Sequence, residues 1–196
     1  MVHLVRVCLL ALIGCWGCSL RVSDRRPALP ADRCPDGVCP AFVKEHPAVN
    51  LPLELRMKNR NGGSCYWVSL ESVAQWQHRP DIAAHIRSTY RGGASTGDLT
   101  GMAKREDYHY AYCTDGDIRF LEWACRTRRG AAITFFSNHA ITIVDLTDAE
   151  AWLCDNNRVG QYIRVPRTEF ERRWRGYGGD AVTLLVGPPA NPLPWL

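Results

Sequence analysis

The chain has 196 residues, of which 46% are hydrophobic and 22% charged, and its formal net charge is +4. This composition is that of an ordinary folded protein, and the length suits one domain with short extensions. The sequence contains no long block of Lys and Arg, whereas neutralising phosphates usually needs a stronger basic patch. We therefore expect no nucleic-acid partner.

The N-terminus has the pattern of an export signal. His3 and Arg6 form a short charged start, and the apolar run 7–13 is too short to span a membrane. The letters LIGC at 12–15 resemble the lipobox of bacterial lipoproteins, in which the chain is cut before a cysteine whose thiol is lipidated. We expect residues 1–14 to be a lipoprotein-type signal peptide, a lipid at Cys15 as the only membrane contact, and an extracytoplasmic location. An ordinary secretion signal or an uncleaved anchor are the alternatives.

Nine cysteines suit an oxidising compartment. Seven remain without Cys8 and Cys15, and an odd number leaves at least one free thiol if the others pair. Cys65 is the one that we expect to be free. Cys34 and Cys39 could close a small loop by a disulfide or form half of a metal site. No second half with matching spacing follows, so we expect neither a metal nor another cofactor.

Helices dominate the first half of the expected domain. Residues 15–50 are rich in Pro, Arg and Asp without a sustained period, which indicates a tether. The domain is expected over 51–187, before a Pro-rich tail at 188–196. Apolar spacing and capping residues predict helices at 65–77, 80–90, 98–105 and 117–128.

The second half changes to β-strands. Runs of β-branched and aromatic residues predict strands at 131–136, 139–146, 151–155, 162–165 and 181–186, with one helix at 167–175. Helices followed by a mostly antiparallel sheet make an α+β fold.

Cys65 is the candidate nucleophile. It opens the first predicted helix, where the helix dipole favours thiolate over thiol, and it follows a Gly-Gly-Ser loop. Its backbone N–H could also help to bind an oxyanion. Taken alone, Cys65 could equally be a buried structural cysteine or half of a disulfide.

His139 and Asp155 are the candidate partners of that thiol. His139 opens an apolar strand, and Asp155 ends the next strand, 16 residues later. A hairpin would bring the two together, and the carboxylate could accept the imidazole N–H and fix its tautomer. A structural histidine and a strand-end turn residue are the alternative interpretations.

The three residues together resemble the papain-like cysteine peptidase superfamily. A small residue precedes the cysteine and an aromatic follows it in Gly63-Ser64-Cys65-Tyr66, and the chain order is Cys, His, Asp. The separation of 139 − 65 = 74 residues is shorter than in papain and closer to the bacteriocin-processing, double-glycine-leader peptidases and their stand-alone relatives. The resemblance covers roughly 51–186. It implies helices, with the nucleophile on the first, packed on the sheet.

The sequence departs from that family at two positions. A Gln six residues before the nucleophile donates to the oxyanion in the family, whereas this chain has Asn59, with Asn61 as a competitor. The first cysteine of the papain signature is replaced by Gly62. No ATP-binding or transmembrane region follows, so we do not expect a leader-processing transporter.

The resemblance implies a peptidase that hydrolyses peptide or isopeptide bonds of a peptide or protein substrate. Cys65, His139 and Asp155 would form its triad, with Asn59 as an oxyanion donor. A transglutaminase-like acyl transferase, a cell-wall amidase and a catalytically silent binding module are the alternatives.

Overall fold

A computed structural model describes residues 41–46, 51–60 and 63–187. Several expectations lie outside these residues: the signal peptide 1–14, lipidation of Cys15, the loop between Cys34 and Cys39, the competing Asn61, Gly62, most of the tether and the tail 188–196. Among the described residues, no helix is long and apolar enough to cross a membrane.

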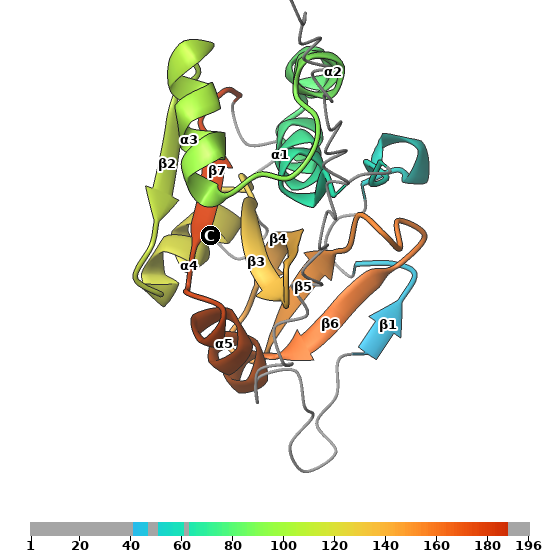
Figure 1. Cartoon of the computed structure of the whole chain (residues 1–196). Helices are drawn as coiled ribbons and strands as arrows, with labels where there is room; N and C mark the ends of the chain where they lie inside the picture. Colours follow the sequence, from blue (N-terminus) through green and yellow to red (C-terminus); the bar gives the residue numbers. More distant parts are fainter. Residues whose placement is uncertain (1–40, 47–50, 61–62, 188–196) are drawn as a thin grey trace, which may run out of the picture.

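The centre of the fold is one antiparallel sheet of seven strands in the order β1-β6-β5-β4-β3-β7-β2 (Figure 1). Strands β3 to β6 form a meander in which each strand pairs with the next. The bounds are β1 Ala41–Val43, β2 Tyr110–Cys113, β3 Ala131–Phe136, β4 His139–Leu146, β5 Glu150–Cys154, β6 Tyr162–Pro166 and β7 Ala181–Leu184. The α+β class and the antiparallel sheet are thus confirmed.

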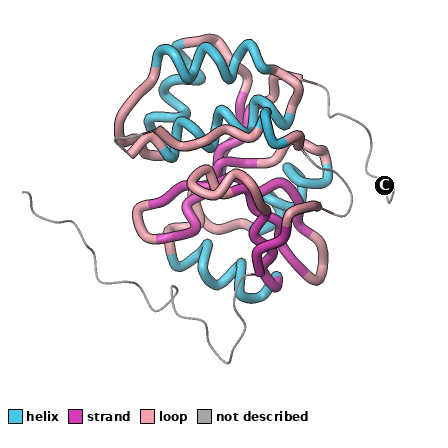
Figure 2. Tube along the Cα trace, turned by 90° about the vertical axis from the view of Figure 1, so that its right-hand side faces the viewer, coloured by secondary structure: helices cyan, strands magenta, loops and turns pink. Residues whose placement is uncertain are grey.

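Five α-helices pack on the sheet. They are α1 Cys65–Trp76, α2 Pro80–Thr89, α3 Thr96–Arg105, α4 Ile118–Arg126 and α5 Arg167–Gly176, with a short 3-10 turn at Leu53–Leu55. Figure 2 shows helices on both sides of the strands. The expected helices at 65–77, 80–90, 98–105, 117–128 and 167–175 are all present, with ends shifted by one or two residues.

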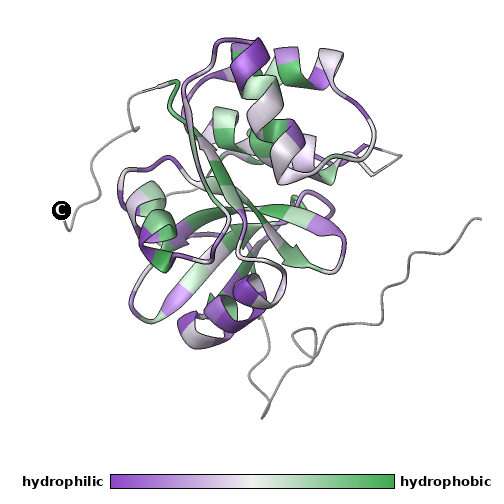
Figure 3. Ribbon diagram, turned by 60° about the vertical axis from the view of Figure 1, so that its left-hand side comes forward, coloured by the Kyte–Doolittle hydropathy of each residue, from purple (hydrophilic) through white to green (hydrophobic). Residues whose placement is uncertain are grey.

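Apolar side chains are buried on both faces of the sheet. On one face, Ile141 and Ile143 of β4 pack with Phe170 and Trp174 of α5. On the other face, side chains of α1, α2 and α3 pack against β3 and β7. Apolar residues accordingly concentrate along the strands, while the outer surface of α5 is hydrophilic (Figure 3).

Helix α1 packs between α2 and the sheet, and all of its residues except Tyr66 are buried. Such a helix can carry polar residues only where they find partners. Glu71 is fully buried and pairs with the guanidinium groups of Arg60 and Arg87. These contacts fix the segment before Cys65 to the same helix that carries Cys65.

The folded chain begins earlier than the expected boundary at residue 51. β1 pairs with β6, and the buried His46 contacts Asp145 through Nε2 at 3.0 Å. The His46 ring also meets the edge of Trp152, with ring centroids 4.8 Å apart. The last described residues of the expected tether therefore belong to the sheet and its core.

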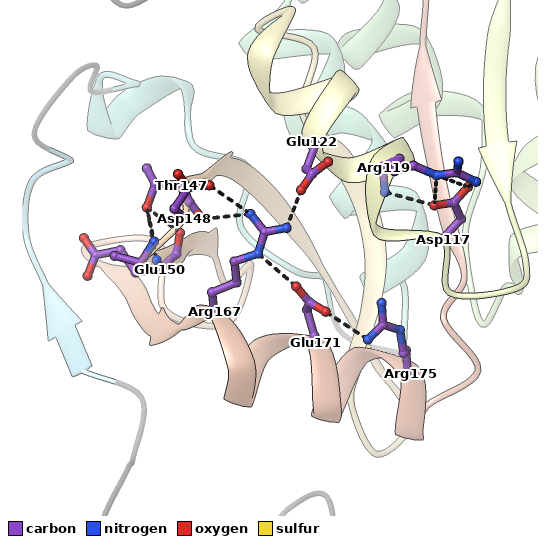
Figure 4. Close-up of polar contacts among 10 residues, drawn as sticks. Asp117, Arg119, Glu122, Thr147, Asp148, Glu150, Arg167, Glu171 and Arg175 are labelled. Atoms are coloured by element: carbon purple, nitrogen blue, oxygen red, sulfur yellow. Dashed lines mark hydrogen bonds and ion pairs between the residues drawn. The ribbon is translucent and has the colours of Figure 1, made fainter.

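An ion-pair network connects α4, the β4–β5 turn and α5 on the surface (Figure 4). Arg167 donates to Glu122 of α4, to Glu171 of α5 and to the carbonyl oxygen of Thr147 in the turn. Because these partners come from three elements, the network ties α5 to the hairpin that carries His139 and leads to Asp155.

Candidate active site

Cys65 is held at the first position of α1 by a tight turn. Gly63 has φ +81°, a left-handed conformation that glycine adopts without steric cost. Ser64 occupies the N-cap position as expected, but its side chain makes no capping hydrogen bond. The backbone N–H of Cys65 has no acceptor within the helix, because the first N–H groups of an α-helix never do.

His139 is positioned by a two-residue hairpin turn. Phe136 of β3 pairs with His139 of β4, so Ser137 and Asn138 alone form the loop. Asn138 has φ +54°, which Asn tolerates better than most residues. The Phe136 ring is stacked beside the imidazole, with centroids 6.2 Å apart. The turn and this aromatic contact together fix where the ring lies.

Asp155 follows β5 directly and reaches back to the histidine. His139 Nε2 and Asp155 Oδ1 are 2.8 Å apart, in a contact where both side chains are largely buried. The backbone N–H of Asn157 donates to the same carboxylate oxygen at 2.9 Å. The hairpin thus brings His139 and Asp155 together as their spacing predicted.

The thiol of Cys65 lies on the other side of the imidazole. Its Sγ is 4.0 Å from the carbonyl oxygens of Gly63 and of Asn138, the residue before His139, and the thiol is close enough to His139 for the imidazole to lower the pKa of Cys65. Since Nε2 is engaged by Asp155, Nδ1 is the ring nitrogen left for the thiol. The structure therefore places the three side chains in the order thiol, imidazole, carboxylate.

This order sets the charge of each group. Burial alone would raise the pKa of Cys65, but the hydrogen bond and the charge of His139 outweigh it and lower that pKa below its ordinary value. Burial opposes the charged form of His139 too, yet the contacts with Asp155 and Cys65 raise its pKa to about 9. Burial is likewise outweighed at Asp155, where the hydrogen bond from His139 lowers the pKa. The arrangement favours a thiolate beside an imidazolium.

The other described cysteines lack this setting. Cys113, Cys125 and Cys154 are also free thiols in the structure, so the described cysteines form no disulfide with one another. Burial raises the pKa of each of these three, that of Cys154 to about 12. Reactive thiols are thiolates. Cys65 is therefore the described cysteine best suited to act as a nucleophile.

Asn59 lies at the Asp155 side of the site. Its Nδ2 donates to Asn157 Oδ1 at 3.0 Å, and Asn157 Nδ2 lies 3.4 Å from His139 Nε2. One N–H of the side-chain amide expected to bind the oxyanion is thus bonded to Asn157 in this conformation. The sequence offered no sign of this contact, because residues 59 and 157 are distant in the chain.

Two open cavities flank the triad. One, of about 660 Å³, is lined by Cys65 and Tyr66, by residues 93–95, by the turn before His139 and by residues 176–178. The other, of about 360 Å³, lies beyond the imidazole and is lined by Phe42, Phe136, Ile163 and residues 155, 157 and 158. An extended chain could therefore cross the thiol with one part in each cavity.

One buried residue of the site was not recognised from sequence as part of it. Asn156 is 2% exposed, and its side-chain Nδ2 contacts the carbonyl oxygens of Cys65 and Ala140 and the hydroxyl of Ser69. The run Asp-Asn-Asn indicated a turn, and that reading left the side chain of Asn156 without a role. Only the packing of α1 against β4 reveals it.

The described residues contain no cluster of three or more His, Cys, Asp or Glu side chains that could hold a metal ion. Compared with protein-family models and with curated proteins, the chain matches none of them. A functional proposal therefore rests on the geometry of the site and on the resemblance of its residues to the papain-like pattern.

Proposed function

We propose that this protein is a papain-like cysteine peptidase that hydrolyses peptide or isopeptide bonds through Cys65, His139 and Asp155. The main support is the geometry at His139: its Nε2 lies 2.8 Å from the buried carboxylate of Asp155, and the imidazole lies close enough to Cys65 to lower the pKa of that thiol. The nucleophile at a helix start and the His-led strand are also what the papain-like resemblance implies.

The chemistry would follow from the charges. The Cys65 thiolate attacks the carbonyl carbon of the scissile bond, and the imidazolium of His139 gives its proton to the leaving amine. The acyl group is then bonded to Cys65. Water, deprotonated by the now neutral imidazole, attacks the thioester, which releases the carboxylic acid and restores the thiolate of Cys65 beside the imidazolium of His139. Asp155 keeps the ring oriented and stabilises its positive charge throughout.

The oxyanion would be bound by the backbone N–H of Cys65, which has no helical acceptor, and by Asn59. In the described conformation Asn59 donates to Asn157. The amide of Asn59 has a second N–H, which would donate to the oxyanion once substrate is bound. We therefore assign Asn59 a role that begins when substrate binds.

The two cavities suit the two halves of a substrate. The larger one includes Cys65 in its lining and suits the acyl half, which becomes bonded to the thiol. The smaller one lies beside Asp155 and Asn157 and suits the leaving half, which takes its proton from His139. Its lining by Phe42, Phe136 and Ile163 favours an apolar side chain there.

A thiol-directed activity probe tests the proposal. A peptidyl acyloxymethyl ketone should label Cys65 in the folded protein and fail to label Cys65→Ala, while Cys154→Ala, a matched loss of a non-catalytic thiol, should be labelled as wild type. The protein should also cleave members of a fluorogenic peptide library. Labelling that persists in Cys65→Ala would contradict the proposed peptidase activity. A folded wild type that shows neither labelling nor cleavage would contradict it too.

The same assay separates hydrolysis from acyl transfer. Adding a primary amine such as putrescine during turnover should leave the carboxylic acid as the main product of a hydrolase. An amide of the added amine as the main product would assign the site to a transglutaminase-like transferase instead.

A further inference from the structure

The side-chain amide of Asn156 lies at the junction between α1 and the meander of strands. Its Nδ2 is 2.9 Å from the carbonyl oxygen of Ala140, 3.2 Å from that of Cys65 and 3.1 Å from Ser69 Oγ. Two of these atoms belong to the main chain at or next to the nucleophile and the base. Asn156 itself directly follows Asp155 in the chain.

The surroundings dictate which way this amide faces. Carbonyl oxygens can only accept, so the NH₂ group of Asn156 must point at Cys65 and Ala140. The Oδ1 atom is then buried without a hydrogen-bond partner among the described residues. An unpaired buried acceptor is unfavourable. The NH₂ group of Asn156 therefore finds its acceptors, whereas its Oδ1 is buried at a cost in free energy.

The backbone of Asn156 adds a fourth connection. Its carbonyl oxygen accepts from the N–H of Asn59 at 2.7 Å. One residue therefore touches the main chain at Cys65, beside His139 and at Asn59, and is bonded to Asp155. Because these contacts come from α1, β4 and the segment before α1, they determine the spacing of thiol, base and oxyanion donor.

We propose that Asn156 is a positioning residue, which holds the first turn of α1 against the start of β4 so that the Cys65 thiol stays in contact with His139. This inference rests on the proposed function for its catalytic meaning. The contact that it predicts can be measured without turnover.

Asn156→Leu tests the inference, because the Leu side chain has the same number and branching of heavy atoms as Asn and no hydrogen-bond donor. The rate of Cys65 alkylation by iodoacetamide is followed against pH by mass spectrometry of the Cys65 peptide. With the contact to His139 loosened, we expect the midpoint to rise by about one pH unit or more, toward the roughly 8.5 of a free cysteine. On a cleaved substrate, kcat should fall about 10²-fold, as for a displacement on the order of 1 Å, with a smaller change in KM.

Thr142→Val is the matched control. Thr142 is also buried, and its hydroxyl donates to the carbonyl oxygen of Ser69 at 3.0 Å, so it too joins β4 to α1, but one turn beyond the nucleophile. This variant should lower the unfolding temperature while leaving the alkylation midpoint unchanged. An Asn156→Leu midpoint that moves no more than that of Thr142→Val would overturn the inference.

A second variant covers the case in which Asn156→Leu does not fold. Ser69→Ala removes one of the three acceptors and keeps the Ser69 carbonyl that Thr142 uses, so its midpoint should move in the same direction by a smaller amount. A Cys65 alkylation midpoint that is the same in Ser69→Ala as in Thr142→Val would again overturn the inference. A folded wild type without peptidase activity would instead count against the proposed function, and the alkylation profiles would still decide the role of Asn156.

Discussion

The imidazole of His139 contacts a thiol on one side and a carboxylate on the other, so its charge depends on both neighbours. Asp155 stabilises the imidazolium, and the imidazolium stabilises the thiolate. Removing one member therefore changes the protonation of the next. The predictions for single residues follow from this dependence of each group's charge on its neighbour.

The first prediction ranks variants of the triad. Cys65→Ala should abolish cleavage, and His139→Ala should lower kcat by at least about 10²-fold, the usual contribution of a positioned acid or base. Asp155→Ala should cost about 10²-fold through a misplaced ring. Asp155→Asn should cost less, because an amide oxygen can still accept from Nε2. Steady-state kinetics on one fluorogenic peptide would check the ranking, and full activity in His139→Ala would contradict the mechanism.

The second prediction concerns pH. Activity needs the Cys65 thiolate and the His139 imidazolium together, so it should fall at low pH as the thiolate gains a proton. It should fall again as pH rises through about 9, where His139 loses its proton. The two limbs belong to the coupled pair. In His139→Ala, the midpoint of Cys65 alkylation should move upward; an unchanged midpoint would mean that the imidazole does not stabilise the thiolate.

The same shifts link the site to stability. The pKa of His139 is raised in the folded protein, so its contribution is complete below the unfolded value of about 6.5 and is lost as pH rises through about 9. The pKa of Asp155 is lowered, so its contribution is present above the unfolded value of about 3.9 and is lost at more acid pH. His139 and Asp155 together therefore stabilise the fold most between the unfolded pKa of Asp155, about 3.9, and that of His139, about 6.5.

At the scale of elements, the hairpin of β4 and β5 is fixed from outside by Arg167. This guanidinium is 19% exposed and pairs with Glu122 and Glu171, whereas Arg119 is 83% exposed and pairs only with the nearby Asp117 (Figure 4). A partly buried network that joins three elements should contribute more than an exposed local pair.

The third prediction compares these two arginines. Arg167→Ala should lower the free energy of unfolding by about 1–3 kcal/mol, the range for charge-assisted hydrogen bonds. Arg119→Ala should change it by about 0.5 kcal/mol or less, as exposed ion pairs do. Urea unfolding followed by tryptophan fluorescence would measure both. Equal losses in the two variants would show that the network adds nothing to the hairpin.

The elements recoverable from sequence are those with strong local patterns. The strands at 131–136 and 139–146 were predicted with their observed bounds, because apolar β-formers run through both and a short polar turn separates them. β2 was missed since its four residues show no clear alternation and pair with β7, some 70 residues away. β1 was missed because three residues in a Pro-rich segment carry no strand signal of their own.

The candidate site divides in the same way. Cys65, His139 and Asp155 each stand at the start or end of a predicted element, so chain order and spacing sufficed to bring them together. The contacts of Asn59 and Asn156 depend on how α1 lies on β4 and on the loop after β5, which no local pattern encodes.

On the scale of the whole molecule, the segment 41–46 closes one edge of the sheet. β1 covers β6, and His46 is 3% exposed between Asp145 and Trp152. Without this segment, the buried Asp145 would lose its contact with His46 and β6 would become an open edge.

The fourth prediction follows from this segment. A chain that begins at residue 41 should keep β1 and His46, whereas one that begins at residue 51 should lose about 1–3 kcal/mol of unfolding free energy, the cost of leaving a buried polar group without a hydrogen-bond partner. Chemical denaturation of the two chains would measure the difference, with His46→Ala in the longer chain as an intermediate case. Equal stability of the two chains would contradict the role given to this segment.

Because the thiol and the imidazole lie in separate layers, the reactivity of Cys65 differs between the unfolded and the folded chain. Cys65 belongs to the helical layer and His139 to the sheet, 74 residues apart in sequence. In an extended chain the thiol has no imidazole beside it, its pKa returns to the ordinary value, and it is a poor nucleophile at neutral pH. The Cys65 thiol thus gains its lowered pKa only when the helical layer packs against the sheet. A nascent chain therefore lacks the lowered thiol pKa of the folded protein.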